Sequence, residues 1–327
     1  MKLRMQLLMG GMLVVIAGSL YAQSAGDYPT RQIRMILPFG PGGASDFVGR
    51  IIATPLSQSL GQQVIVDYRA GAAGNIGMEV AARAAPDGYT IFLGNVGTLA
   101  INPHMYRSLK IDPLKDFAPV TLVVDVPGAL VVHPSLPVKS AKELVTFAKA
   151  RPGQLNFGSA GPGSINRLDM EIFMKLNGMN MVHVPYKGGA GQAVTGIVSG
   201  EVVSMFVTLS SAVGFIKDNR LRALGIVAPQ RIAAVQNVPT MAEQGFAQMT
   251  SGSWQGVLVP TGTPRAVVDR LFREVQKVLA LPDTKERLDR GGVSVLVSKS
   301  PEEFATFMRV QSGRWGTVVR EANIIAD

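Results

Sequence analysis

The sequence lacks cysteine entirely and has few histidines and aromatic residues. None of its 327 residues is cysteine, which excludes disulfides, thiolate metal sites and a cysteine nucleophile. The three histidines, His104, His133 and His183, are far apart and form no HExxH motif, so no metal site is expected. Aromatic residues make up 6% of the chain, and basic residues occur singly instead of in blocks. Binding to nucleic acid is therefore not expected.

Sequence motifs for catalysis and cofactor binding are also missing. In GPGGAS (40–45), Ser45 occupies the last glycine position of the dinucleotide motif GxGxxG, and no Gly-rich turn ends in the Lys–Ser/Thr of a P-loop. The segment FGSAG begins with Phe157, where a nucleophile elbow GxSxG needs glycine. We therefore expect no catalytic residues and no cofactor. One alternative stays open, a transferase whose Gly-rich turns bind phosphate, but it needs a positioned base or metal.

The N-terminus has the layout of an export signal. Lys2 and Arg4 precede an apolar stretch at 7–20, and small residues follow it. This order is typical of a cleaved signal peptide, and the stretch is shorter than the roughly 20 apolar residues of a spanning helix. We expect a signal peptide of residues 1–22, or alternatively 1–25, and a location in the periplasm. Removing Lys2 and Arg4 lowers the formal charge of +9 to +7 (9 − 2), a mild bias toward anionic ligands.

A single structural unit recurs along the chain: an apolar strand, a Gly-rich turn and a helix. The first copy has its strand at 33–39 and its turn at 40–46, and five further copies follow. Strands alternating with helices predict parallel βαβ units and an α/β fold. Ligands of such sheets bind at the carboxyl ends of the strands. The turns lie at those ends, and each leads to a helix N-terminus with unpaired N–H groups, so they favour anions.

The order of the units predicts two lobes. Strand-like segments at 118–126 and 253–259 bracket the fourth to sixth units. A second lobe is therefore expected at 127–250, with the first lobe formed by 23–126 and completed by 251–327. Two chain crossings between lobes make a hinge.

Several segments resemble one known family. They are YPTRQIRMILPFGPGGASDFVGR, GQQVIVDYRAGAAGNIG, APDGYTIFLGNVGTLAINP, DPLKDFAPVTLV, LNFGSAGPGS, MVHVPYKGGAG and SPEEFATFMR. In this order and spacing the chain resembles the Bug-type (TctC-type) substrate-binding proteins of tripartite tricarboxylate transporters. The resemblance implies a type II periplasmic binding protein fold, with a cleft between two lobes for a small carboxylate (an organic acid). It also implies delivery to membrane permease subunits, and we expect a monomer. A sensor that reports the ligand to a membrane partner is the alternative.

The resemblance also implies a set of ligand-binding residues. The first lobe would contribute Phe39, Gly42, Gly43, Ala44, Ser45, Asp46, Gly74, Asn75, Gly97 and Thr98. The second lobe would contribute Ser159, Ala160, Gly161, Ser164, Tyr186, Lys187, Gly188 and Gly189. Backbone N–H groups and hydroxyls would hold a carboxylate, and Phe39 and Tyr186 would flank the apolar part of the ligand.

Two positions depart from the family pattern. Members often carry aspartate where this chain has Val207, and many carry histidine where it has Arg167. The lost carboxylate and the gained guanidinium both favour anions over ligands with an ammonium group. We therefore expect a mono- or dicarboxylate without a free ammonium, with Arg167 near a second carboxylate if it faces the cleft.

Overall fold

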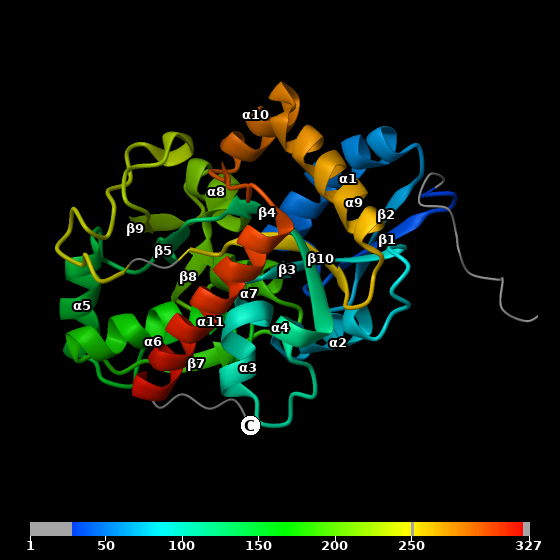
Figure 1. Ribbon diagram of the computed structural model, residues 1–327. Helices are drawn as coiled ribbons and strands as arrows, with labels where there is room; N and C mark the ends of the chain where they lie inside the picture. The colour runs from blue at the N-terminus through cyan, green and yellow to red at the C-terminus, as the bar shows by residue number, and fades with distance from the viewer. Residues whose placement is uncertain (1–27, 250–251, 323–327) are drawn as a thin grey trace, which may run out of the picture.

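The computed structural model describes residues 28–249 and 252–322, which form two α/β lobes side by side (Figure 1). The expected signal peptide lies outside the described residues. Each lobe contains one β-sheet covered by helices on both faces. The expected two-lobed α/β fold is confirmed.

The sheet of the first lobe has the strand order β11-β4-β10-β3-β1-β2. Its strands are β1 (Ile33–Leu37), β2 (Val64–Tyr68), β3 (Thr90–Asn95), β4 (Phe117–Asp125), β10 (Gln255–Pro260) and β11 (Ser294–Val295). Strand β1 runs parallel to β2 and β3, as the repeating unit predicts. Strand β10, from the returning chain, lies antiparallel between β3 and β4, so the sheet is mixed and not purely parallel.

Side chains alternate across these strands and bury two apolar layers. Helices α1 (Ala44–Leu60), α9 (Arg265–Ala280) and α10 (Pro282–Arg290) cover one face. Helices α2 (Asn75–Ala82), α3 (Asn102–Met105) and α11 (Pro301–Ala322) contribute to the other. Met35 faces the first layer and Ile36 the second, as the two-residue period of a strand requires.

The sheet of the second lobe has the order β7-β6-β8-β5-β9. Its strands are β5 (Gly128–Val132), β6 (Asn156–Ser159), β7 (Val182–Pro185), β8 (Ser204–Thr208) and β9 (Arg222–Val227). Helices α5 (Ala141–Lys149) and α6 (Ile165–Asn177) pack on one face, and α7 (Ala190–Val198) and α8 (Leu209–Lys217) on the other. Strand β6 is parallel to its neighbours, whereas β5 is antiparallel to β8 and β9.

Two crossing segments join the lobes and pair with each other. The N–H of Val126 donates to the carbonyl of Ser253 (3.3 Å), and the N–H of Ser253 donates back to Val126 (2.9 Å). Pro127 and Gly252 continue this antiparallel pairing. The connection is therefore a short two-stranded ribbon, and the lobe boundaries at 126/127 and 250/251 stay a prediction.

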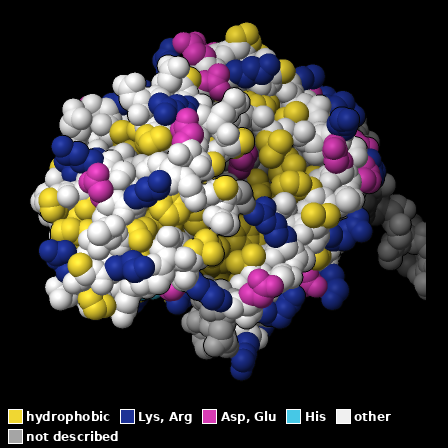
Figure 2. All heavy atoms as spheres, turned by 90° about the vertical axis from the view of Figure 1, so that its left-hand side faces the viewer, with side chains coloured by type: hydrophobic (Ala, Val, Ile, Leu, Met, Phe, Trp, Pro, Cys, Tyr) yellow, Lys and Arg dark blue, Asp and Glu magenta, His cyan; other side chains and the backbone are white. Residues whose placement is uncertain are grey.

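The outer end of the second lobe carries dispersed charges. Figure 2 shows lysine and arginine side chains scattered singly over this face, with acidic side chains among them and apolar side chains near its middle. This face therefore has no continuous basic stripe of the kind that tracks a nucleic-acid backbone.

Candidate ligand-binding cleft

A small cavity of about 40 Å³ lies between the lobes, where the N-termini of several helices converge. Its lining residues are Phe39, Gly43, Ala44, Ser45, Asn95, Gly97, Ala160, Ser164, Ile165, Asn166, Ala190, Thr208 and Ser253. Most of them are the N-cap residue or the first helical residues of α1, α6, α7 or α8. None of these described lining residues is charged.

Three of the helix ends around the cavity have no side-chain cap in the described part of the chain, although the first N–H of α8, that of Leu209, donates to the Pro127 carbonyl at 2.9 Å. Among the described residues, no N-cap side chain accepts a hydrogen bond from the first turn of α1, α7 or α8. The N-cap residues of these helices are Gly43, Gly189 and Thr208. The first N–H groups of a helix have no intrahelical acceptor, and the macrodipole makes this end positive. A fourth helix end, that of α6, is capped by Ser164, whose side chain accepts from the Arg167 N–H. Helix ends gathered around one cavity in this way can hold an anion without lysine or arginine.

Seven of the residues expected from the sequence line this cavity. They are Phe39, Gly43, Ala44, Ser45, Gly97, Ala160 and Ser164. The hydroxyl of Ser164 is held on the turn, because it donates to the Gly161 carbonyl at 2.7 Å. The ligand-binding role of these residues stays a prediction.

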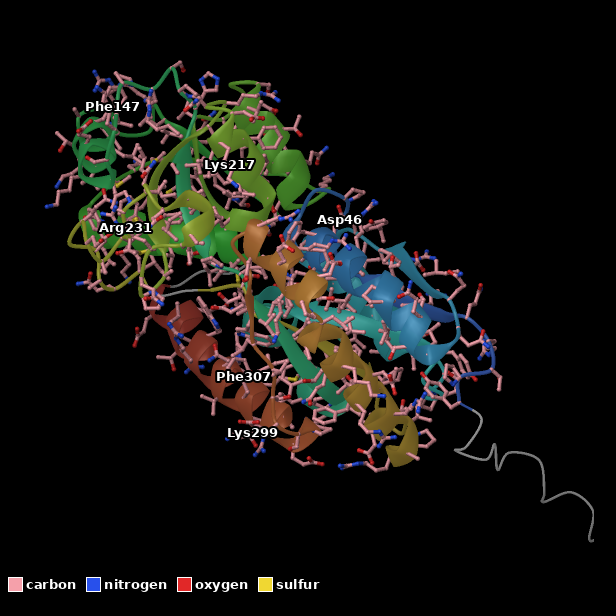
Figure 3. The ribbon with its side chains drawn as sticks, turned by 90° about the horizontal axis from the view of Figure 1, so that it is seen from above. Asp46, Phe147, Lys217, Arg231, Lys299 and Phe307 are labelled. Carbon is pink, nitrogen blue, oxygen red and sulfur yellow. The ribbon has the colours of Figure 1, made fainter. Side chains whose placement is uncertain are left out.

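Asp46 shapes the first turn and is not among the residues that line the cavity. Its carboxylate accepts bonds from the Gly42 N–H (2.8 Å), the Tyr68 hydroxyl (2.5 Å) and Arg50 Nε (2.5 Å). Burial raises the pKa of Asp46, but these donors outweigh it and bring the pKa below its ordinary value. Figure 3 places Asp46 at the end of α1 that faces the second lobe. The side chain therefore positions the helix end.

Asn75 and Thr98 make hydrogen bonds that hold the turns beside the cavity. Thr98 Oγ1 and the N–H of Asn95 are 3.1 Å apart, and the N–H of Thr98 donates to Asn95 Oδ1 at 3.0 Å. Asn75 Oδ1 accepts a bond from Asn102 Nδ2 at 2.6 Å. Gly74 has a φ of 92°, and a Cβ there would lie 2.6 Å from Thr98 Cγ2. These residues fix the turns after β2 and β3.

Ser159 is paired with a histidine on the neighbouring strand. Its hydroxyl oxygen lies 2.6 Å from His183 Nε2 and accepts a hydrogen bond from the Gly161 N–H at 3.1 Å. Burial, and then the charge of Arg167, lower the pKa of His183 to about 4. The imidazole is therefore neutral near pH 7, and the pair holds the 159–161 turn in shape.

The two departures from the family pattern lie in different places. Arg167 Nε pairs with Glu171 at 3.3 Å, and Arg167 is not among the described residues that line the cavity. The guanidinium, expected near a second carboxylate only if it faces the cleft, is thus engaged on its own helix. Val207 lines a second, inner pocket of about 10 Å³, together with Asp169 of α6.

The remaining expected residues lie where the two lobes touch or beside α7. The N–H of Gly40 donates to the Gly188 carbonyl at 3.3 Å, so the turn at 39–42 touches the turn after β7. A Cβ on Gly189 would lie 3.1 Å from the Phe39 ring. Tyr186 and Lys187 instead line a separate surface recess of about 490 Å³ beside α7. We take the smaller cavity as the site, because it lies between the lobes and is surrounded by helix ends.

Six lining residues were missed by sequence reasoning: Asn95, Ile165, Asn166, Ala190, Thr208 and Ser253. Four of them are an N-cap or one of the first two residues of a helix. Those four would have been predicted if every first helical turn that follows a strand, and not only the glycines, had been assigned to the site. Ser253 belongs to the interlobe ribbon and carries no such signal.

In the described ranges 28–249 and 252–322, no group of three or more His, Asp or Glu side chains is placed to hold a metal ion. In the same ranges no helix is both long enough and apolar enough to cross a membrane.

Comparison with known proteins identifies the family. The sequence model described as "tripartite tricarboxylate transporter family receptor" (TctC) matches residues 48–324. The protein BugT of Bordetella pertussis is 35% identical over 312 residues, 95% of each chain. Among solved structures, the periplasmic binding protein BugD is 31% identical with a TM-score of 0.88, covering 91% of this chain and 99% of its own.

Two further similar structures contain a ligand. Rpa4515 of R. palustris, solved with adipate, is 32% identical with a TM-score of 0.88, covering 91% of this chain and 99% of its own. MatC of Rhodopseudomonas palustris, with bound malate, is 30% identical with a TM-score of 0.84, covering 89% of this chain and all of its own. The chain therefore belongs to the TctC family of tripartite tricarboxylate transporter receptors, of which the Bug proteins are relatives.

Proposed function

We propose that this chain is a periplasmic solute-binding protein that captures a small carboxylate and delivers it to the permease subunits of a tripartite tricarboxylate transporter. The observation that carries the proposal is the convergence of four helix N-termini on one cavity between the lobes whose described lining residues are all uncharged. Each helix end stabilises a negative charge by about 0.3–1 kcal/mol at exposed sites. The acids bound by Rpa4515 and MatC support a ligand of the same chemical class here.

Capture would proceed by closure of the two lobes about the ribbon. In the present structure the lobes already touch through the turns that contain Gly40 and Gly188. A ligand carboxylate would bind the N–H groups of α1 from the first lobe and of α6, α7 and α8 from the second. Because these donors come from both lobes, the ligand stabilises the closed arrangement. The ligand-bound, closed protein is the form that a transporter could distinguish from the open one.

We expect ligand binding to raise the stability of the fold. At a ligand concentration a hundredfold above the dissociation constant, linkage adds about 2.7 kcal/mol to the free energy of unfolding. A thermal-unfolding screen should include mono-, di-, hydroxy- and amino acids, with adipate and malate among them. At least one acid should raise the melting temperature, and its uncharged amide should not. Stabilisation by amides as strong as by the acids would contradict an anion site.

We also propose that the chain acts as an exported monomer without catalytic activity, and that residues 1–22 are removed on export. Intact-mass measurement of the protein recovered from the periplasm of a Gram-negative host should give a chain that begins near residue 23. Recovery of the full-length chain from the membrane fraction would contradict this expectation.

A further inference from the structure

The inner end of the cleft carries a buried acidic side chain. Asp169, at 3% exposure, lines the inner pocket together with Val207 and Gly128. It lies four residues after Ile165, which lines the main cavity. Residues at this spacing share one face of a helix, so α6 presents both side chains to the cleft.

The inner pocket and the main cavity are adjacent but differ in charge. They share the lining residues Ile165, Asn166, Thr208 and Ser253. The main cavity is surrounded by helix N-termini, and none of its lining residues in the described part of the chain is charged, whereas the inner pocket has the Asp169 carboxylate. A ligand that reaches from one to the other therefore meets N–H donors at one end and an acceptor at the other.

The size of the inner pocket limits what can enter it. Its volume of about 10 Å³ corresponds to roughly one water-sized group. A hydroxyl or an ammonium group has this size, and a carboxylate is larger. A second carboxylate would also lie beside the carboxylate of Asp169, and like charges at such short range are unfavourable.

We propose that Asp169 is a specificity-determining residue that selects a monocarboxylate carrying a hydrogen-bond donor, a hydroxyl or an ammonium group, over a dicarboxylate. The inference rests on the carboxylate-binding function proposed above. It replaces the expectation drawn from Val207 and Arg167, because Arg167 pairs with Glu171 while Asp169 lines the pocket that Val207 also borders.

Calorimetry on the wild-type protein tests this selection directly. The probes are four-carbon acids: butyrate, the 2-, 3- and 4-hydroxybutyrates, the corresponding aminobutyrates, and succinate. The best donor-bearing acid should bind about tenfold or more tightly than both butyrate and succinate, since it gains a hydrogen bond to a charged group. Tighter binding by a hydroxy acid than by its amino analogue identifies a hydroxyl ligand, and the reverse order identifies an ammonium ligand.

The variant Asp169→Asn removes the charge at nearly constant shape. We expect it to remove the advantage of the donor-bearing acid and to strengthen succinate by about tenfold, as the repulsion is lost. Asp218→Asn is the control, because it removes the same charge from the exposed C-terminal end of α8, away from the helix ends that surround the cavity, and should leave the ranking unchanged. If Asp169→Asn does not fold, the wild-type ranking alone decides.

Two results would overturn the inference and leave carboxylate capture standing. One is wild-type binding of succinate or butyrate at least as tight as that of every donor-bearing acid. The other is an equal weakening of all acids by Asp169→Asn. If no acid of either kind binds the wild-type protein, the proposed function itself falls, and this inference falls with it.

Discussion

Gly191→Ala should abolish tight ligand binding without unfolding the protein. Gly191 is the second residue of α7, and a Cβ at this position would lie 2.2 Å from the Pro41 carbonyl oxygen and 2.9 Å from Gly42 Cα. These atoms belong to the backbone of the opposite lobe, so no side chain can rotate away to relieve the contact. The methyl group would therefore keep the lobes apart.

The expected loss of affinity is large. If about 1% of the molecules remained able to close, the apparent affinity would fall roughly a hundredfold. The free energy of unfolding should not decrease, since alanine is favoured over glycine inside a helix by up to about 1 kcal/mol. Calorimetry gives the affinity, and small-angle scattering should show no ligand-induced compaction of the variant.

Gly214→Ala provides the matched control for this experiment. Gly214 lies in α8, and a Cβ there would meet no atom of residues 28–249 or 252–322 within 4 Å. This variant should bind ligand as the wild type does. Unchanged binding by Gly191→Ala would show that the contact between the turn at 39–42 and α7 is not part of the ligand-bound state.

Asp46→Ala should cost roughly 3 kcal/mol of folding free energy near pH 7, because it removes several hydrogen bonds to a charged acceptor. The Gly42 N–H, the Tyr68 hydroxyl and Arg50 all lose the carboxylate. The pKa of Asp46 is lowered in the folded protein, so the stabilisation is present above the unfolded pKa of about 3.9. It disappears as the pH falls through the lower, folded value.

Urea unfolding of wild type and variant at pH 7 and near pH 3 measures this difference. The gap between the two proteins should shrink at the lower pH. Asp269→Ala is the control, because Asp269 pairs with an exposed arginine on the surface, and such pairs contribute about 0–1 kcal/mol. An equal gap at both pH values would mean that the charge of Asp46 does not stabilise the turn.

The sequence was sufficient to predict the repeating strand–turn–helix units and seven of the thirteen described residues that line the cavity. Apolar strands followed by glycine and a helix are local patterns, and they led to Phe39, the start of α1 and Ser164. The antiparallel position of β10 could not be predicted, because it depends on pairing between segments more than 150 residues apart. Nothing local in the sequence specifies that pairing.

The direction of individual side chains was also beyond the sequence. A carboxylate in a Gly-rich turn can bind a ligand or hold the turn itself, and Asp46 does the latter. Tyr186 follows the same turn pattern as Phe39, yet it faces the recess beside α7. Asp169 lies beyond the first turn of α6, outside any motif centred on the glycines.

Because the cavity is surrounded by backbone ends of helices, its ligand preference depends on where each helix begins. Most point substitutions leave the N–H groups of a helix end in place. The insertion or deletion of one residue between β1 and α1, or between β6 and α6, would move a set of donors by about 1.5 Å along the helix and turn it by roughly 100°. Relatives with similar side chains in these turns but different turn lengths are therefore expected to differ in ligand more than relatives that differ only by substitution.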